Sequence, residues 1–486
     1  MAQAGEAAAA PASASGRSVW AQLADRVNPA YDRPRLRPDV VVRGFTTTDG
    51  EAYYIAKSPS AGTYVRLGPD EQYLLALMDG SHQVADLMEA YVQRYQRFAF
   101  DRVVHLVHEL RQQRFLVGEP RDAWGGLAAA LARHTWTYRI DQVIQSYRYH
   151  EFPLTGLDGP LTALYRAGGW AAFTPPVLLL GAVLALVGAG LFVWELLFGD
   201  RDILRFRGSY TLGLLTFLAL WTAVISLHEL GHALTTKHFG CEVRRGGVML
   251  YYGLPAFFTD TSDIWMAPRR ARLLVSVAGM ATIWALGGLA MLVVVWQPSS
   301  LLAPIAFQLA LVAYVNNTLQ LVPLLELDGY YLLIDWLEMP RLRARALAFI
   351  RAELWRKLKR RTPFSREERI FTVYGTLALL YSGLVLAAAT YLWARRLQRL
   401  LADAWVQEGV GWRVLVIVVA LAFGIPLLFG TALKLWQLAR AVGRLLARLR
   451  PPHPARRGAP GAPDHRPAPA RASGPAIARR RCAGPG

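Results

Sequence analysis

Cysteine is scarce in this chain, and its scarcity excludes a disulfide framework. Cys241 and Cys482 are the two cysteines among 486 residues, and neither belongs to a Cys-x-x-Cys pair. The first 17 residues are rich in alanine and serine and lack the apolar core of a secretory signal. We therefore expect no cysteine chemistry, and we expect the first membrane segment only near residue 177.

Acidic residues are also few, with 35 Asp and Glu against 54 Lys and Arg, so the formal net charge is +19. Nucleic acid is one partner for such a charge. However, the basic residues concentrate beside apolar segments and near the C-terminus, as in Arg356–Arg361 and Arg479–Arg481. Anionic lipid headgroups are the simpler partner for this distribution, and we expect no nucleic acid.

Long apolar runs, by contrast, are plentiful. Crossing a bilayer takes roughly 20 apolar residues, and six segments have about that length: 177–198, 209–230, 272–296, 301–323, 371–394 and 411–433. They predict a mainly α-helical, polytopic membrane protein with about six transmembrane helices. Glu195 lies within the first segment and Pro426 within the last, so the count changes if either segment fails to cross.

The charges of the loops predict the orientation of these helices. The long loops 231–271 and 324–370 hold many Lys and Arg, whereas the loops on the opposite side hold few. The positive-inside rule then places both long loops and both termini in the cytoplasm. We expect a multi-pass protein of a bacterial-type inner (cytoplasmic) membrane.

Outside the apolar segments, the composition divides the chain. We expect a flexible leader (1–37), a small α+β winged-helix-like domain (38–120), a connector (121–176), a membrane domain (177–437) and a basic disordered tail (438–486). Strands, helices and a short return strand are expected in the α+β domain, in this order: Val40–Phe45, Ala52–Ala56, Tyr64–Leu67, Glu71–Met78, Val84–Tyr95, Asp101–Arg114 and Phe115–Val117.

The α+β segment resembles the PqqD-like peptide-recognition domains of ribosomal-peptide maturation systems. The resemblance lies in Tyr64–Leu67 before a helix, in Met78–Gly80 at its end, and in the last helix leading into Phe115–Val117. It covers about 80 residues and implies that a leader peptide binds by adding a strand to a sheet edge. A structural cap and a DNA-binding winged helix are the alternatives.

The residues with the clearest chemistry lie at the end of the second apolar segment, in Ile225–Ala233. Its His-Glu-x-x-His motif places His228 and His232 four residues apart, on one face of a helix, where both imidazoles can bind one zinc ion. Glu229 lies beside them and can take a proton from a water that the metal acidifies. Ionisable groups in a membrane helix are costly unless they are functional, which favours a metal site over a chance match.

A catalytic zinc site needs a third protein ligand. His238 follows at metzincin spacing, but Thr235 stands where that motif has glycine. If the helix continues, His238 lies about 15 Å along the axis from His228, so we expect a surface histidine. Asp328 lies at the end of the fourth apolar segment, at the same predicted depth as the histidines. An ordinary Asp-Gly turn is the alternative for it.

Together these motifs resemble the site-2 protease family of membrane zinc metallopeptidases, whose second signature is Asn-x-x-Pro-x-x-x-Leu-Asp-Gly with the Asp as third zinc ligand. Pro323, Leu327, Asp328 and Gly329 match that signature, and Gln320 departs from it where the family has Asn. The chain is closer still to the peptide zinc metalloprotease subgroup. That likeness spans about 38–395 and includes three further stretches: Phe257–Trp265, Asp328–Tyr331 and Glu338–Pro340.

The resemblance implies a zinc metallopeptidase with His228, His232 and Asp328 as ligands and Glu229 as general base. It implies a peptide or membrane-associated polypeptide as substrate, such as a ribosomally synthesised precursor. Two other functions stay open: a regulatory intramembrane protease that cuts a transmembrane anchor, and a non-proteolytic peptide-binding or export component. Three polar residues near the end of the fourth segment are candidates for substrate binding, with helix packing as the alternative: Asn316, Asn317 and Gln320.

Overall fold

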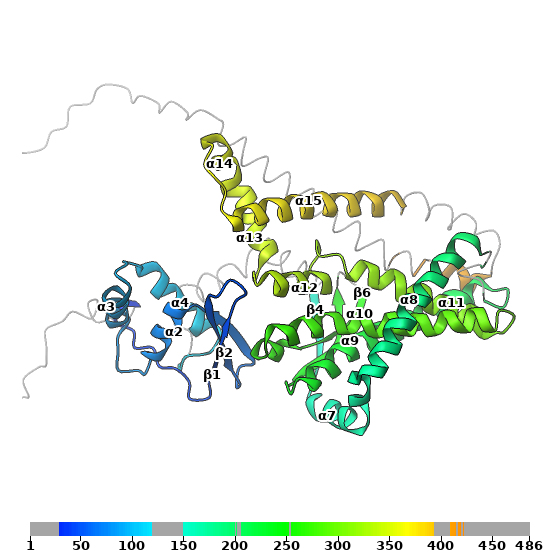
Figure 1. Cartoon of the computed structure of the whole chain (residues 1–486), viewed down its shortest axis with the longest axis horizontal. Helices are drawn as coiled ribbons and strands as arrows, with labels where there is room; N and C mark the ends of the chain where they lie inside the picture. Colours follow the sequence, from blue (N-terminus) through cyan, green and yellow to red (C-terminus); the bar gives the residue numbers. More distant parts are fainter. Residues whose placement is uncertain are drawn as a thin grey trace, which may run out of the picture. The chain divides into compact units, whose positions relative to one another are not determined.

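The structure is a computed structural model that describes residues 29–118, 149–199, 201, 206–251, 254–392, 409–414, 417–418 and 421. Helices predominate, and two small antiparallel sheets accompany them (Figure 1). The predicted leader 1–37 and connector 121–176 fall partly outside the described residues, and the predicted tail 438–486 falls wholly outside them.

Among the described residues, four helices are long and apolar enough to cross a membrane: α8 (Pro175–Phe198), α9 (Tyr210–His238), α10 (Arg269–Trp296) and α11 (Leu302–Gln320). They coincide with the first four predicted segments, so the protein is a helical, membrane-associated protein. The fifth predicted segment falls on α15 (Arg366–Leu392), and the sixth lies mostly outside the described residues. The total of six spans stays a prediction.

Small residues let the membrane helices approach closely. A Cβ at Gly188 of α8 would lie 2.2 Å from the Cα of Gly288 in α10, so the two backbones touch at this crossing. Tyr314 of α11 joins the same crossing because its hydroxyl donates to the carbonyl of Ala185, 3.1 Å away. Packing through small residues is the usual way in which helices associate within lipid.

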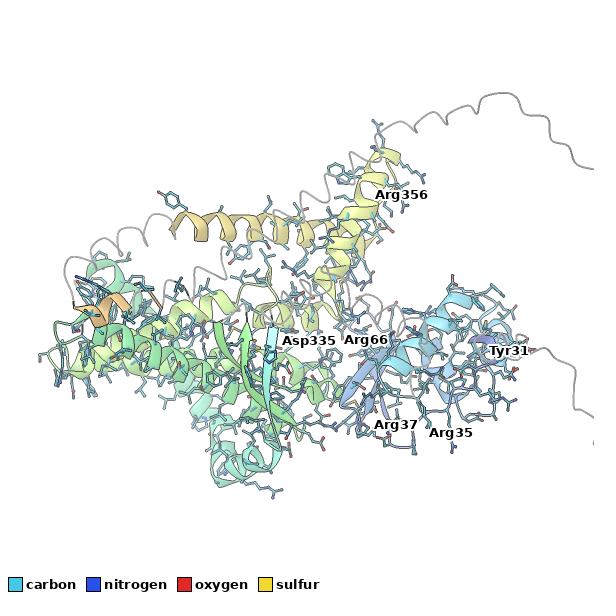
Figure 2. All side chains as sticks on the ribbon, turned by 180° about the vertical axis from the view of Figure 1, so that it is seen from behind. Tyr31, Arg35, Arg37, Arg66, Asp335 and Arg356 are labelled. Atoms are coloured by element: carbon cyan, nitrogen blue, oxygen red, sulfur yellow. The ribbon has the colours of Figure 1, made fainter. Side chains whose placement is uncertain are left out.

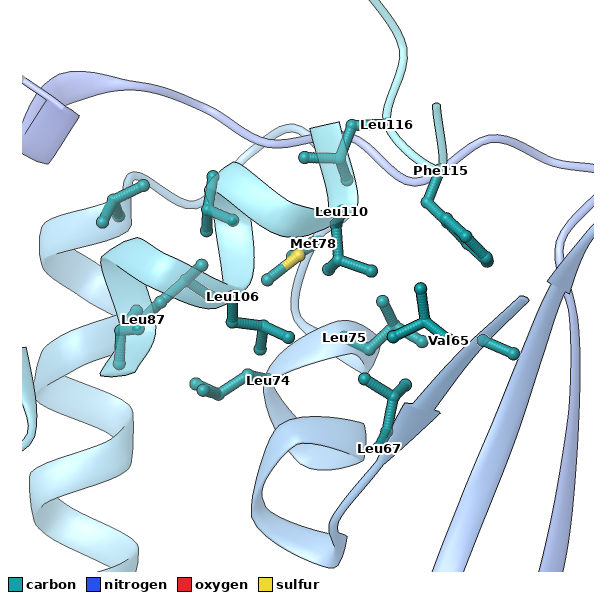
Figure 3. Close-up of a cluster of buried hydrophobic side chains, with 14 of the residues drawn as sticks. Val65, Leu67, Leu74, Leu75, Met78, Leu87, Leu106, Leu110, Phe115 and Leu116 are labelled. Atoms are coloured by element: carbon teal, nitrogen blue, oxygen red, sulfur yellow. The ribbon is translucent and has the colours of Figure 1, made fainter. Parts of the chain in front are cut away.

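The N-terminal module, residues 29–118, begins with the 3₁₀ turn η1 (Pro29–Tyr31). A three-stranded antiparallel sheet follows, in the order β1 (Val41–Thr46), β2 (Ala52–Ser58), β3 (Thr63–Leu67). Three helices then cover it: α2 (Pro69–Ala76), α3 (Val84–Tyr95) and α4 (Phe100–Gln112). Their apolar faces form one buried cluster, which includes Leu67, Leu74, Leu87 and Leu110 (Figure 3).

The predicted return strand Phe115–Val117 is reduced to a single antiparallel bridge. Leu116 pairs with Leu36, and hydrogen bonds run from the Arg37 N–H to the Phe115 carbonyl and from the Val117 N–H to the Arg35 carbonyl. The physical reason is that Phe115 and Leu116, although neighbours in the sequence, both bury their side chains in the module's core. A strand at the edge of a half-buried sheet would instead alternate buried and exposed side chains.

The second sheet has the order β4 (Tyr149–Thr155), β5 (Arg245–Tyr251), β6 (Leu254–Thr259), and all its pairings are antiparallel. Its first strand lies in the predicted connector, which also contains α7 (Asp158–Ala167) and the 3₁₀ turn η2 (Gly169–Phe173). The connector is therefore partly structured. Gly247 has φ 154°, and a Cβ there would lie 2.3 Å from the carbonyl oxygen of Phe152, so only glycine allows β5 to approach β4.

The remaining elements precede α10 or follow α11 in the sequence. The 3₁₀ turn η3 (Ser262–Met266) leads into α10, and α12 (Asp328–Leu337) follows α11 after a short turn. The chain then continues through α13 (Leu342–Phe349), the π-helical turn η4 (Ile350–Leu354) and α14 (Trp355–Arg360) into α15. The first turn of α12 contains Asp328, so the fold places this residue at a helix start.

Replacing Gly188 by Ala tests the α8–α10 crossing. The added methyl group has no room, and overpacking of this kind costs about 1–3 kcal/mol. We expect Gly188→Ala to lower the thermal midpoint of the detergent-solubilised protein. Gly190→Ala is the matched control, because no atom lies within 4 Å of a Cβ there. Equal midpoints for the two variants would contradict the crossing.

Candidate metal centre

Helix α9 carries the two histidines of the centre. Its start is fixed by Ser209, whose Oγ accepts a hydrogen bond from the backbone N–H of Leu212. His228 and His232 lie more than four turns later, and both are buried. Their Nε2 atoms are 3.1 Å apart, and their rings meet edge to face with centroids 4.8 Å apart. The helix therefore aims both imidazoles at one point, as the spacing predicts.

Asp328 reaches the same point from α12. Its Oδ2 lies 2.7 Å from His228 Nε2 and 3.3 Å from His232 Nε2. One ligand atom from each of the three residues lies within 4.8 Å of the others. The structure thus brings together the three residues that the sequence predicts as ligands.

The donor set fits a metal ion. A tetrahedral ion with bonds of about 2.0–2.1 Å holds its ligand atoms roughly 3.3 Å apart. The distances among His228 Nε2, His232 Nε2 and Asp328 Oδ2 are 2.7, 3.1 and 3.3 Å, close to that spacing. Two imidazole nitrogens and a carboxylate oxygen are also ligand types that zinc prefers.

The outer nitrogen of His232 sets its tautomer. Nδ1 lies 2.7 Å from the carbonyl oxygen of Val275 in α10, so this nitrogen carries the proton and donates it. Nε2 therefore presents its lone pair to the centre, the arrangement usual for a metal-binding histidine. The Nδ1 of His228 is buried and has no hydrogen-bond partner among the described residues.

Glycines give the histidines room against α10. A Cβ at Gly279 would lie 2.5 Å from His232 Nε2 and 2.7 Å from His228 Nε2. On the facing helix, a Cβ at Gly231 would lie 2.7 Å from Thr282 Oγ1. Gly279 and Val275 were not predicted as part of the centre. An isolated glycine in an apolar segment is a signal of close packing, but it does not name the neighbour.

A sharp turn places Asp328. A Cβ at Gly329 would lie 2.2 Å from the carbonyl oxygen of Leu321, so the start of α12 presses against the end of α11. The hydroxyl of Tyr374 in α15 donates to the carbonyl of Pro323 within the connecting turn, at 3.1 Å. Because Asp328 is in the first turn of α12, the positive end of the helix dipole favours its negative charge.

Glu229 follows His228 directly and is half-buried. Thr259, the last residue of β6, contacts this turn, with its Oγ1 3.5 Å from the backbone oxygen of Glu229. The second sheet therefore ends beside the helical turn that carries the predicted base.

The three candidate substrate-binding residues differ in how deeply they are buried. Asn317 is fully buried, and its Nδ2 donates to the carbonyl of Met280 at 2.9 Å, so it packs α11 against α10 beside Gly279. Asn316 and Gln320 are half-buried. A role in substrate binding stays a prediction for them.

His238 is exposed at the end of α9, as predicted. Its ring stacks on Phe173 with centroids 4.3 Å apart, and its Nδ1 lies 2.9 Å from the hydroxyl of Tyr165. These contacts hold it against α7 and η2 and away from the two ligand histidines.

A separate charged group joins the N-terminal module to the turn before α10. Asp263 is buried, and it accepts hydrogen bonds from the Tyr64 hydroxyl and the Glu242 backbone N–H, each at 2.8 Å. Lys57 Nζ lies 2.7 Å away. Burial raises the pKa of the Asp263 carboxyl, but these three donors outweigh it and hold the pKa below its usual value. Asp263 therefore stays charged and paired.

Comparison of the chain with protein-family models, with curated proteins and with solved structures finds no match.

Replacing Asp328 by Ala tests the ligand set. We expect the purified variant to hold well under half of the wild-type metal per chain, measured by plasma mass spectrometry, because two histidines alone bind weakly. Asp260→Ala is the control, since Asp260 pairs with Arg245 at 3.0 Å outside the centre. Unchanged stoichiometry in Asp328→Ala would remove this residue from the ligand set.

Replacing Gly279 by Ala tests the packing around the histidines. The new methyl group overlaps both imidazole Nε2 positions, so the rings must rotate away from the shared point. Changes to groups that orient ligands typically cost 10- to 100-fold in metal affinity, and we expect a loss of about that size. Competition with a chromogenic chelator measures it. Gly383→Ala, where no atom lies within 4 Å of a Cβ, should bind as the wild type does.

Proposed function

We propose that the protein is a membrane-embedded zinc metallopeptidase of site-2 protease type, which hydrolyses peptide bonds of a peptide or membrane-associated polypeptide. The observation that carries the proposal is the meeting of His228, His232 and Asp328 at one buried point, with Glu229 on the same helical turn. Three protein ligands leave one position of a tetrahedral ion open, which is the arrangement of catalytic rather than structural zinc.

Each residue has a distinct part in the proposed reaction. His228, His232 and Asp328 would hold the ion, and His232 Nδ1 keeps its proton and donates it to the Val275 carbonyl, so that ring keeps its orientation throughout. Zinc in this site supplies Lewis acidity, which lowers the pKa of water toward about 7 and polarises a carbonyl oxygen. Glu229 accepts the proton of the attacking water and passes it to the leaving amine, as a general base and then a general acid.

The position of β6 beside Glu229 supports an extended polypeptide as substrate. β6 ends at Thr259, against the turn of Glu229, so an extended polypeptide that reaches this turn passes the end of a sheet. We propose that the N-terminal module presents the substrate in the manner of PqqD-like domains, and that the substrate is a ribosomally synthesised precursor. The proposed setting is a bacterial-type inner membrane with both termini in the cytoplasm and with anionic lipids as neighbours of the basic segments.

Replacing Glu229 by Gln separates metal binding from chemistry. The amide cannot accept the proton, so we expect full zinc content with hydrolysis of fluorescein-labelled casein reduced by a factor of about 10² or more. Glu326→Gln is the matched control, because Glu326 is exposed two residues before Asp328 and should leave the rate unchanged. Hydrolysis by Glu229→Gln at the wild-type rate would favour a peptide-binding or export role.

A further inference from the structure

The N-terminal module contacts the far end of the helix that carries Asp328. Arg66 of β3 donates from Nη1 to the backbone carbonyl of Glu338, the C-cap residue of α12, at 2.9 Å. Thr48, in the turn between β1 and β2, donates from its backbone N–H and its hydroxyl to the Glu338 carboxylate, at 2.8 and 3.1 Å. The C-terminal end of α12 is therefore bonded directly to the module.

A buried arginine of α10 makes the same connection from the other side. Arg272 is 6 % exposed, and its Nε donates to Asp335 Oδ1 at 3.1 Å while its Nη2 donates to the Tyr53 hydroxyl at 3.0 Å. Its Nη1 lies 3.3 Å from the carbonyl oxygen of Ala267. Figure 2 labels Asp335 of α12 and Arg66 of the module. A buried guanidinium is tolerated only when its donors are satisfied, so Tyr53 and Asp335 are both needed.

Helix α10 connects this contact to the histidines. Arg269, Arg272, Val275 and Gly279 follow one another at spacings of three, three and four residues, which places them along one face of the helix. Val275 and Gly279 contact the ligand histidines. Arg269 donates to the backbone carbonyls of Asp335 and Trp336 at the negative end of α12, where a cation is favoured.

The Tyr53 hydroxyl is held in place from the module side. Tyr53 lies on β2 and is buried; its ring stacks on Phe45 with centroids 5.6 Å apart, and the guanidinium of Arg66 lies 4.0 Å above it. The side chain therefore presents its hydroxyl to Arg272 at a fixed position. The contact depends on the module being folded and docked.

We propose that the N-terminal module is a positioning element of the metal centre. Through Tyr53, Arg272 and Asp335, and through Arg66 and Glu338, it clamps the C-terminal end of α12 and so holds Asp328, two turns away on the same helix, within reach of both histidines. The proposal rests on the metal centre of the proposed function but not on peptide hydrolysis. It assigns the module a task beyond presenting a substrate.

Thermodynamic linkage gives the proposal a second consequence. If docking of the module strengthens metal binding by some factor, metal binding must strengthen docking by the same factor. A polypeptide that loosens the module would then weaken metal binding, and one that tightens it would strengthen the centre.

A pair of Tyr→Phe variants tests the clamp in the full-length, detergent-solubilised protein. Tyr53→Phe removes the hydroxyl that Arg272 uses, so we expect zinc affinity, measured by chelator competition, to fall about tenfold. The visible spectrum of bound Co²⁺, which reports ligand geometry, should change with it. Tyr64→Phe is the matched control: it removes a module hydroxyl bonded to Asp263 but not to α10 or α12, and it should bind zinc within twofold of the wild type.

Hydrogen exchange supplies a readout that a merely structural role would not change. Zinc should slow amide exchange in β2 of the wild type and of Tyr64→Phe, and it should do so less in Tyr53→Phe. If Tyr53→Phe does not fold, Asp335→Asn replaces it, because the amide keeps the acceptor oxygen and removes the charge that pairs with Arg272. This variant should lose zinc affinity by a similar factor.

The outcomes distinguish failure of the positioning role from failure of the metal centre itself. Equal zinc binding by the wild type and Asp328→Ala would overturn the centre. Loss of zinc in Asp328→Ala, together with wild-type affinity and Co²⁺ spectra in both Tyr53→Phe and Asp335→Asn, would overturn only the positioning role. An equal loss in Tyr53→Phe and Tyr64→Phe would show that docking of the module as a whole supports the centre, and it would overturn the specific route through Tyr53, Arg272 and Asp335.

Discussion

The meeting of two buried imidazoles and a half-buried carboxylate among apolar helices is the constraint on which this structure depends. Polar side chains of this kind lose hydration when they are gathered in an apolar bundle, which costs free energy unless they are paired or bind an ion. Two contacts offset part of this cost. The Val275 carbonyl accepts the Nδ1 proton of His232, and the first turn of α12 gives Asp328 a favourable dipole, whereas the buried Nδ1 of His228 has no partner among the described residues.

The close approach of α9 and α10 follows from the same constraint. The histidines can meet Asp328 only if α10 leaves them space, and the missing side chain at Gly279 provides it. Gly231 does the same from α9, where a Cβ would meet Thr282. These glycines stabilise the centre because a side chain at either position would collide with the facing helix. Their importance is therefore visible only once the position of that helix is known.

Local patterns in the sequence predict much of this molecule. Helix length and hydropathy locate α8 to α11, and helical spacing places His228 and His232 on one face, because both properties are set within one segment. The third ligand was predicted from depth and from a resemblance, and the structure places Asp328 beside the histidines. The metal and the reaction stay predictions.

Contacts between distant segments were not predictable in the same way. β4 pairs with β5 about ninety residues later, and Tyr53 meets Arg272 across 219 residues. A tyrosine in a strand and an arginine near a helix start are both common, so neither residue alone indicates the contact. Asp263 shows the same limit, because it is buried where Lys57 and Tyr64 reach it from the module.

The buried arginine also changes how the N-terminal module must be studied. Deleting the module is the obvious way to ask whether it recognises a substrate. However, deletion removes Tyr53 from Arg272 and removes Arg66 and Thr48 from Glu338, so the C-terminal end of α12 loses its contacts with the module. A truncated chain would then lose activity through its metal centre even if the module never bound a peptide. Substitutions on exposed β1, such as at Val41 and Val42, leave Tyr53 and Arg66 in place, so they separate substrate recognition from assembly of the centre.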